Sequence, residues 1–143
     1  MYRHILIPVD GSETSRAALR HALKLAKEEG ARVRLVYVLE KIRHVVTEGV
    51  VDLTAAMRRE GESFLDEALR EARAGGVDAT TALVEAGDRP IAEAIVNEAT
   101  AAHSDLIAIG THGRRSVERL LLGSVAEGVL RRATGTVLLI RGN

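Results

Sequence analysis

The sequence predicts an α/β fold with a five-stranded parallel sheet and helices on both faces. Short apolar runs alternate along the chain with longer segments in which apolar residues recur at helical spacing. Several of the runs are apolar at every position, which is typical of strands that are covered on both faces of a parallel sheet. Turn residues separate these segments, so strands and helices are expected to alternate through right-handed crossovers.

Composition limits the classes of protein to which the chain can belong. Its 143 residues fit one domain, 1–143, and 46% hydrophobic with 28% charged residues argues against disorder. A formal net charge of +0 favours neither nucleic acid nor an anionic membrane as a partner. There are no cysteines, no signal peptide is visible, and no apolar stretch approaches the roughly 20 residues of a membrane span. We therefore expect a cytoplasmic protein with no membrane span and no nucleic-acid partner.

The first strand–helix unit is expected between residue 5 and Gly30. A strand over residues 5–9 tolerates Pro8, which lacks an N–H, because this proline lies near the strand's end. Asp10 and a glycine form the turn, and Ser12 is the expected N-cap of a helix. Ala18, Leu19, Ala22, Leu25 and Ala26 share one face of that helix. Gly30 is placed to end it.

The middle of the chain predicts two more strands around a long helix. Residues 33–39 are rich in β-branched side chains and form the second strand, whereas residues 40–52 are irregular and predict a loop. A helix then runs to about residue 74, where a pair of glycines ends it. Residues 77–85 form a third strand whose lower apolar content places it near a sheet edge.

The last third of the chain supplies two strands and two helices. The turn Gly-Asp-Arg-Pro opens a helix with Pro90 in its first turn, where a missing N–H costs little. The fourth strand covers residues 106–109, and a glycine-containing segment and another helix follow it. Thr136–Ile140 forms the fifth strand, and its apolar side chains at a sheet edge predict pairing with a second copy of the chain.

The glycine-containing segment is the first candidate site. Gly110 and Gly113 follow the fourth strand, and after nine residues Gly123-Ser124 precedes the last helix. Glycine lets the backbone approach a ligand closely, and a serine is a common cap at a helix start. The N–H groups at that end of a helix, together with the helix dipole, attract anions. The spacing is compatible with a phosphate cradle and also with ordinary turns before a capped helix.

A second segment favours the phosphate cradle. Ligands in open parallel sheets bind at the carboxyl ends of the strands, where the strand order reverses. If the first and fourth strands are neighbours, Asp10 and Gly110 flank that point. Asp10 then has three open roles, which are to accept a ribose hydroxyl, to hold Mg²⁺ through a bound water, or to cap the first helix. His112 and Arg114 lie in the glycine turn, where each is either a phosphate contact or an exposed residue.

Other chemistries lack the motifs that they require. No Gly-Lys-Ser/Thr of a Walker A loop and no Gly-x-Gly-x-x-Gly after the first strand is present. The five histidines show no metal-ligand spacing, and no nucleophile elbow or Ser/His/Asp arrangement is visible. The sequence therefore predicts neither a metal centre of the His/Cys type nor an acyl hydrolase.

Gly110-x-x-Gly113-(nine residues)-Gly123-Ser124 resembles the nucleotide-binding signature of universal stress protein domains, in their ATP-binding branch. The resemblance also covers residues 5–12, the Gly-Asp-Arg-Pro turn and the order of elements, which is essentially the whole chain. It implies a Rossmann-like sheet of strand order 3-2-1-4-5, similar to that of the adenine nucleotide α-hydrolases. It also implies a homodimer joined through the fifth strand.

The resemblance assigns a role to each part of the site. Asp10 contacts the ribose, Val38 contacts the adenine, and Gly110 lies by the ribose and first phosphates. The later glycines and the start of the last helix hold the phosphates through backbone N–H groups. The residues that it implies for nucleotide binding are Pro8, Asp10, Val38, Gly110, His112, Gly113, Arg114, Gly123, Ser124 and Val125.

The expected function is that of an ATP-binding regulatory module with slow or no hydrolysis, because no residue is evidently placed to position a water for in-line attack. ATP is the expected ligand, with Mg²⁺ as a possible companion. Two alternatives stay open. One is a slow ATPase or phosphotransferase that uses Asp10 and Mg²⁺, and the other is an adaptor that binds AMP or cyclic AMP.

Overall fold

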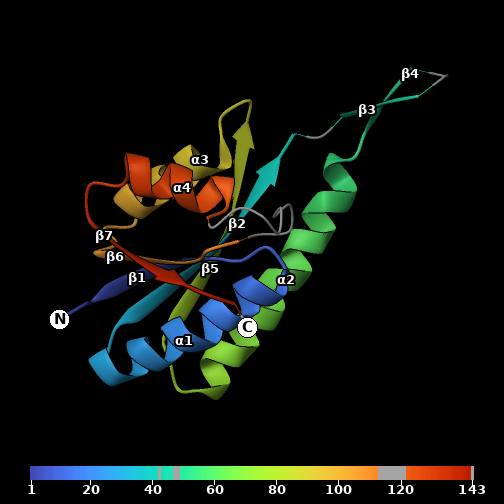
Figure 1. The fold of residues 1–143 in the computed structure, drawn as a ribbon. Coiled ribbons are helices and arrows are strands. Elements are labelled where there is room, and N and C mark those ends of the chain that lie inside the picture. Colours follow the sequence, from blue (N-terminus) through green and yellow to red (C-terminus); the bar gives the residue numbers. More distant parts are fainter. Residues whose placement is uncertain (42, 47–48, 113–121, 143) are drawn as a thin grey trace.

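A computed structural model describes residues 1–41, 43–46, 49–112 and 122–142 of the chain (Figure 1). Five strands form the main sheet, in the spatial order β5-β2-β1-β6-β7. Its strands are β1 (His4–Pro8), β2 (Arg32–Glu40), β5 (Ala79–Gly87), β6 (Leu106–Gly110) and β7 (Thr136–Ile140). The helices are α1 (Glu13–Glu29), α2 (Thr54–Ala74), α3 (Ile91–Ala101) and α4 (Ser124–Arg132). All neighbouring strands of this sheet run parallel, so the predicted strand order 3-2-1-4-5 is confirmed.

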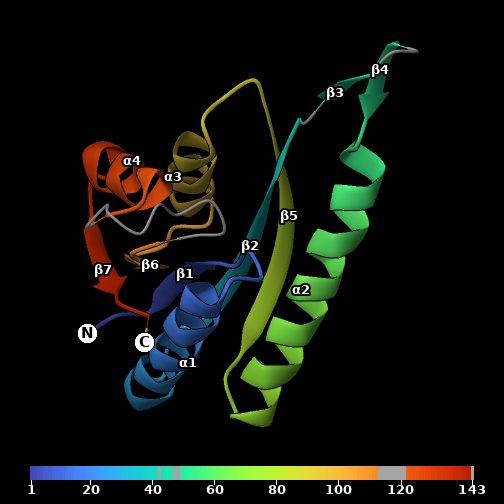
Figure 2. The same cartoon turned by 45° about the vertical axis from the view of Figure 1, so that its right-hand side comes forward.

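The sheet separates two apolar layers, as the fully apolar strands predict. In β1, Ile5 and Ile7 pack in one cluster with the inner faces of α1 and α2, whereas Leu6 packs on the other face with α3 and α4. All three side chains are completely buried. Figures 1 and 2 show the two pairs of helices on opposite faces of the sheet. Alternate residues of β1 therefore serve different layers, and no polar side chain fits in its centre.

Most of the predicted boundaries hold to within two residues. Ser12 is the N-cap of α1, and its Oγ accepts a hydrogen bond from the Ser15 N–H at 3.1 Å. Gly30 ends α1 in the left-handed region, at φ 68°. Pro90 is the N-cap of α3, one position before the first turn where it was expected. The prediction of β5 as an edge strand is confirmed.

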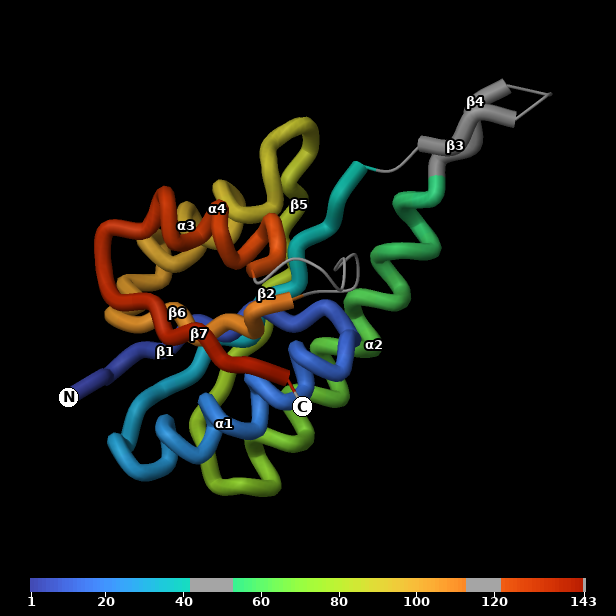
Figure 3. The backbone as a smooth tube through the Cα atoms, in the orientation of Figure 1, coloured from blue at the N-terminus to red at the C-terminus, as the bar shows by residue number. Residues whose placement is uncertain are grey.

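The prediction of an irregular loop over residues 40–52 is wrong. β3 (Arg43–Val46) and β4 (Gly49–Asp52) pair in antiparallel fashion as a separate two-stranded sheet. Gly49 begins the returning strand, where it pairs with Val46, the last residue of β3. A pair of valines lies on each side of the turn, which is the pattern of a hairpin. Figure 1 shows β3 and β4 beyond the main sheet, between the ends of β2 and α2. Figure 3 traces the backbone of the main sheet, with α1 and α2 on one side of it and α3 and α4 on the other.

The turn between β1 and α1 depends on a glycine for two reasons. Gly11 has φ 83°, in the left-handed region that other residues adopt at a cost. A Cβ at this position would lie 2.3 Å from Cζ of Phe64, whose ring packs over the turn from α2. The path of the chain after β1 is therefore set both by backbone conformation and by contact with α2.

We expect Gly11→Ala to lower the free energy of unfolding by about 2–5 kcal/mol, the sum of a left-handed alanine and an overpacked contact. Gly30→Ala is the matched control, because its φ is also positive but nothing lies within 4 Å of the added Cβ. Its cost should be only about 1–2 kcal/mol. Urea unfolding measures both values, and Phe64→Leu added to Gly11→Ala should recover part of the loss. Equal costs at the two glycines would contradict the role of Phe64.

A carboxylate joins the beginnings of β1 and β6. Asp105 directly precedes β6 and accepts hydrogen bonds from the backbone N–H groups of Arg3, at 2.9 Å, and His4, at 3.1 Å. Burial alone would raise the pKa of Asp105. The N–H groups of Arg3, His4 and Asp105 itself, with the charge of His4, outweigh burial and lower the pKa.

A lowered pKa in the folded state makes Asp105 stabilising above its unfolded pKa of about 3.9, and this contribution is lost as the pH falls through the lower folded value. We therefore expect Asp105→Asn to be less stable than the wild type at pH 7. The difference should stay constant down to about pH 5 and shrink below about pH 4. Urea unfolding at several pH values measures it, and a difference that grows on acidification would contradict this account.

Candidate functional site

One cavity of about 700 Å³ lies at the carboxyl ends of the central strands. It is lined by residues that end β1, β2 and β6 and by residues that begin α3 and α4. β1 stands between β2 and β6 in the sheet, so the strand order reverses here. This is where open parallel sheets bind ligands, and the volume lies in the usual range for small-molecule sites.

The structure brings together every predicted site residue that it describes. The cavity is lined by Pro8, Asp10, Val38, Gly110, His112, Gly123, Ser124 and Val125. The other two predicted residues, Gly113 and Arg114, lie outside the described residues. Segments more than 100 residues apart in the chain thus meet at one site, as the positions of Asp10 and Gly110 at neighbouring strand ends predicted.

Several lining residues were not predicted as part of the site. Apolar side chains from β2, α2 and α3 line the side of the cavity that lies towards β2. They are Val36, Tyr37, Met57, Ile91, Ala92 and Ile95. The helical residues among them lie on the inward faces of α2 and α3. A residue on such a face can lie either in the core or on a cavity, and sequence spacing does not distinguish the two. Arg132, on the last turn of α4, also lines the cavity and adds a positive charge.

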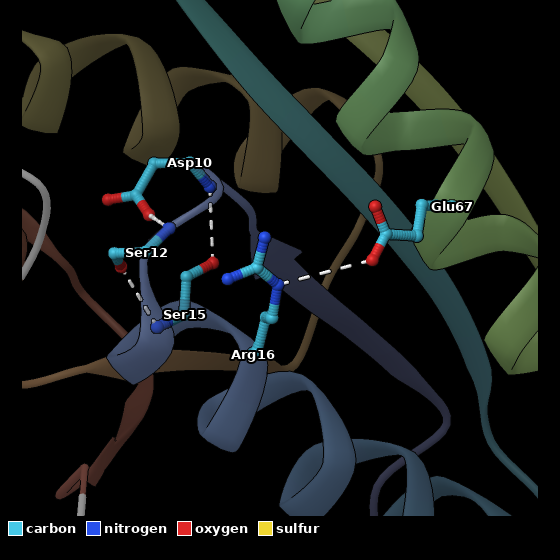
Figure 4. Close-up of polar contacts among 5 residues, drawn as sticks. All are labelled: Asp10, Ser12, Ser15, Arg16 and Glu67. Carbon is cyan, nitrogen blue, oxygen red and sulfur yellow. Dashed lines mark hydrogen bonds and ion pairs between the residues drawn. The ribbon is translucent and has the colours of Figure 1, made fainter.

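Asp10 holds the turn that forms the floor of the site. One of its carboxylate oxygens accepts the Ser12 N–H at 2.9 Å, and the Asp10 N–H donates to Ser15 Oγ at 3.1 Å (Figure 4). Among the described residues, the second carboxylate oxygen has no hydrogen-bond donor. Asp10 does not cap α1, whose N-cap is Ser12, but its carboxylate secures the turn that leads into the helix. The second oxygen can accept a hydrogen bond from a ligand in the cavity.

Gly110 has a structural role that the sequence did not reveal. A Cβ at this position would lie 2.7 Å from Cγ2 of Thr14 and 3.2 Å from its backbone oxygen. The glycine therefore lets the first turn of α1 approach the end of β6. This contact accounts for Gly110 without a ligand, although the residue also lines the cavity.

The start of α4 differs by one residue from the expectation that Ser124 caps it. Gly123 is the N-cap, no side chain caps the helix, and Ser124 is its first, exposed residue. The Gly123 N–H donates to the Thr111 carbonyl at 2.6 Å and is therefore engaged. The N–H groups of Ser124, Val125 and Ala126 open the helix and have no partner within it, as in any α-helix. These three donors line the cavity with the positive end of the helix dipole.

His112 is held by its neighbour. Its Nδ1 lies 3.1 Å from Oγ1 of Thr111, which is 7% exposed and fixes the ring's orientation. The imidazole is half-buried on the wall of the cavity, beside the start of α4. Among the described residues, no group of three or more His, Cys, Asp or Glu side chains could hold a metal ion.

β2 extends beyond β1, and no strand in the described part of the chain pairs with the last part of its edge on that side. The pairing of β1 with β2 ends at Pro8 and Val36, and the Val9 N–H donates to the Val36 carbonyl at 2.8 Å. Because a strand repeats every two residues, the N–H and carbonyl of Val38 point to the same side as the Val36 carbonyl, which is the side of β1. The chain has already left β1 in the Asp10 turn, so Val38 presents one backbone donor and one acceptor to the cavity that it lines.

Comparisons with known proteins agree with this arrangement. Residues 1–141 match the sequence model of the universal stress protein family. A universal stress protein from Methanocaldococcus jannaschii is 37% identical over 144 residues, which cover 99% of this chain and 83% of that protein. Within the described residues, no helix is long and apolar enough to cross a membrane.

Solved structures of similar proteins share the fold over nearly the full length. A universal stress family protein from Burkholderia pseudomallei is 36% identical with a TM-score of 0.81, over 97% of this chain and 96% of that one. The universal stress protein from Archaeoglobus fulgidus in complex with dAMP is 26% identical with a TM-score of 0.69, over 97% and 98% of the two chains.

Proposed function

This chain belongs to the universal stress protein family, and on that basis we propose that it is a regulatory module that binds ATP in the described cavity. The observation that supports this most is the meeting of eight predicted residues around one space of about 700 Å³. The cavity offers separate surroundings for the base, the sugar and the phosphates of a nucleotide.

The free edge of β2 suits an adenine. The Val38 N–H can donate to N1 of adenine, and the Val38 carbonyl can accept from its exocyclic amine. Guanine presents a donor and an acceptor in the opposite order, so it would leave both backbone groups unpaired, which is costly in a buried site. Apolar side chains of β2, α2 and α3 surround this edge and provide contact for the base.

The start of α4 suits the phosphates. Three backbone N–H groups without helical partners, together with the helix dipole, form an anion site of the kind seen at many phosphate-binding helices. Asp10 fits a Mg²⁺ ion that accompanies ATP, since such ions are held by one or two carboxylates plus the substrate phosphates. When bound, Mg²⁺ would neutralise part of the phosphate charge, and Asp10 would hold it directly or through water.

We expect ATP hydrolysis to be slow or absent. Fast phosphoryl transfer to water needs a group that orients the attacking water in line with the leaving group. Among the described lining residues, the carboxylates are Asp10 and Glu40. Asp10 is the carboxylate that we assign to Mg²⁺, and Glu40 lies at the end of β2, on the side where we place the base. Binding without turnover suits a module whose bound state is its signal.

A second candidate ligand is AMP. It is favoured by the Archaeoglobus fulgidus relative, which is described in complex with dAMP. A monophosphate would use the same Val38 edge but fewer of the N–H groups of α4. Competition of AMP against bound ATP separates the two, because a site built for the phosphate chain binds ATP more tightly.

Ser124 gives the sharpest test of ATP binding. It is exposed at the first position of α4, where an added carboxylate stabilises the helix by about 0.3–1 kcal/mol but repels a phosphate. Ser124→Asp should therefore keep or raise the melting temperature while it weakens ATP binding at least about tenfold, or about 1.4 kcal/mol. Isothermal titration calorimetry with ATP and Mg²⁺ measures the binding.

Ser124→Asn is the matched control, since it has nearly the same shape and no charge. It should bind ATP within about threefold of the wild type. No heat of binding for the wild type would refute the proposal. Equal ATP affinities of the Ser124→Asp and Ser124→Asn variants would mean that the phosphates do not lie at the start of α4. Phosphate release above that of a buffer blank would support the slow ATPase instead.

We also propose a homodimer joined through β7. This strand pairs with β6 on one side only and is an edge of the sheet, and Val137, Leu138 and Leu139 on it are half-buried.

Light scattering at micromolar concentration should give twice the chain mass of 15.4 kDa. Leu138→Lys should shift the protein to a monomer, because a lysine on an edge strand opposes pairing. Leu53→Lys, on an exposed leucine before α2, should leave the dimer intact, and a monomeric wild type would rule the dimer out.

A further inference from the structure

Met57 is the contribution of α2 to the cavity. No other residue of this helix, which is described over its whole length, lines the space. Met57 is half-buried and packs against the core layer under α1 and α2. The chain has one other methionine, Met1, which is 93% exposed and does not line the cavity. The two thioethers therefore differ in exposure and in their distance from the cavity lining.

Close helix packing holds Met57 over the end of β2. One turn further along α2, a Cβ on Gly61 would lie 2.4 Å from Cδ1 of Tyr37, so the helix backbone rests directly on that ring. Tyr37 precedes Val38 on β2, and both residues line the cavity. The Met57 side chain therefore belongs to the side of the cavity where we place the base.

The first turn of α2 carries Met57. Its N-cap is Leu53, which provides no side-chain cap, and the turn contains no acidic residue to balance the helix dipole. Arg58 pairs with Glu85 at the end of β5, but these side chains are 41% and 62% exposed, and such pairs contribute little to stability. Access to the Met57 sulfur comes from the cavity, because Met57 is half-buried and lines a space that small solutes can enter.

We propose that Met57 is an oxidation site that controls nucleotide affinity, an inference that rests on the proposed nucleotide binding. A peroxide transfers one oxygen atom to the thioether sulfur, giving the sulfoxide and, from hydrogen peroxide, one water. Sulfur loses two electrons, and the O–O bond takes them up as it breaks. The reaction turns a flexible apolar side chain into a polar one, and it is reversed by methionine sulfoxide reductases.

The sulfoxide weakens binding for a physical reason. In the free protein its oxygen is solvated through the open cavity. A bound base would cover that oxygen and displace the water that solvates it in the cavity that Met57 lines. Burying an unsatisfied acceptor disfavours the complex, and we expect the Kd for ATP to rise about tenfold.

The test treats the whole protein with hydrogen peroxide, with and without saturating ATP, and follows each methionine by peptide mass spectrometry. ATP should slow oxidation of Met57 and leave that of Met1 unchanged, so Met1 serves as an internal reference. Calorimetry on the oxidised protein should show the tenfold weaker binding, and treatment with a sulfoxide reductase should restore the original Kd.

Met57→Leu is the matched variant. Whatever its own affinity for ATP, its Kd should be the same before and after peroxide. Because this variant retains Met1, any effect of oxidation at Met1 would persist in it. An unchanged Kd at full oxidation of Met57, or equal oxidation of Met57 with and without ATP, overturns the inference. Untreated protein that binds no nucleotide would instead refute the proposed function.

Discussion

The site depends on the early end of β1. Gly11 turns the chain in the left-handed region beneath the Phe64 ring, and Asp10 secures the turn through the N–H of Ser12. Because the chain leaves the sheet there, no described strand pairs with β2 beyond Val36 on that side, and Val38 lines the cavity. A longer β1 would fill the space, so the turn creates the cavity.

Backbone groups form part of the polar lining of the cavity. Val38 presents its main chain, and α4 presents the N–H groups of its first turn, while Gly123 is already bonded to Thr111. Such groups are held by the sheet and the helix and cannot change rotamer, so they are preorganised for a ligand. Side chains provide the variable part of the site. Among them, Met57 comes from α2, whose first turn has no side-chain cap.

The differences between the sequence interpretation and the structure have one origin. The loop predicted over residues 40–52 contains a hairpin in which Gly49 pairs with Val46, and Gly110, predicted as a ligand contact, also makes room for Thr14. Ser124 was taken as a cap, although the N-cap is the residue before it. A glycine or serine shows that a turn or a helix start is near. Which atom occupies the space beside it depends on residues distant in the chain.

Local pattern was sufficient for the alternation of strands and helices, the edge position of β5, the Ser12 cap and the glycine spacing that marked the site. These features follow from side-chain periodicity and backbone conformation, which act within a few residues. Tertiary structure decided that Met57 and Ile95 line a cavity instead of filling the core. It also decided that Val38 has a free edge. Periodicity identifies the buried face of an element, but only the packed elements determine where the space between those faces is left open.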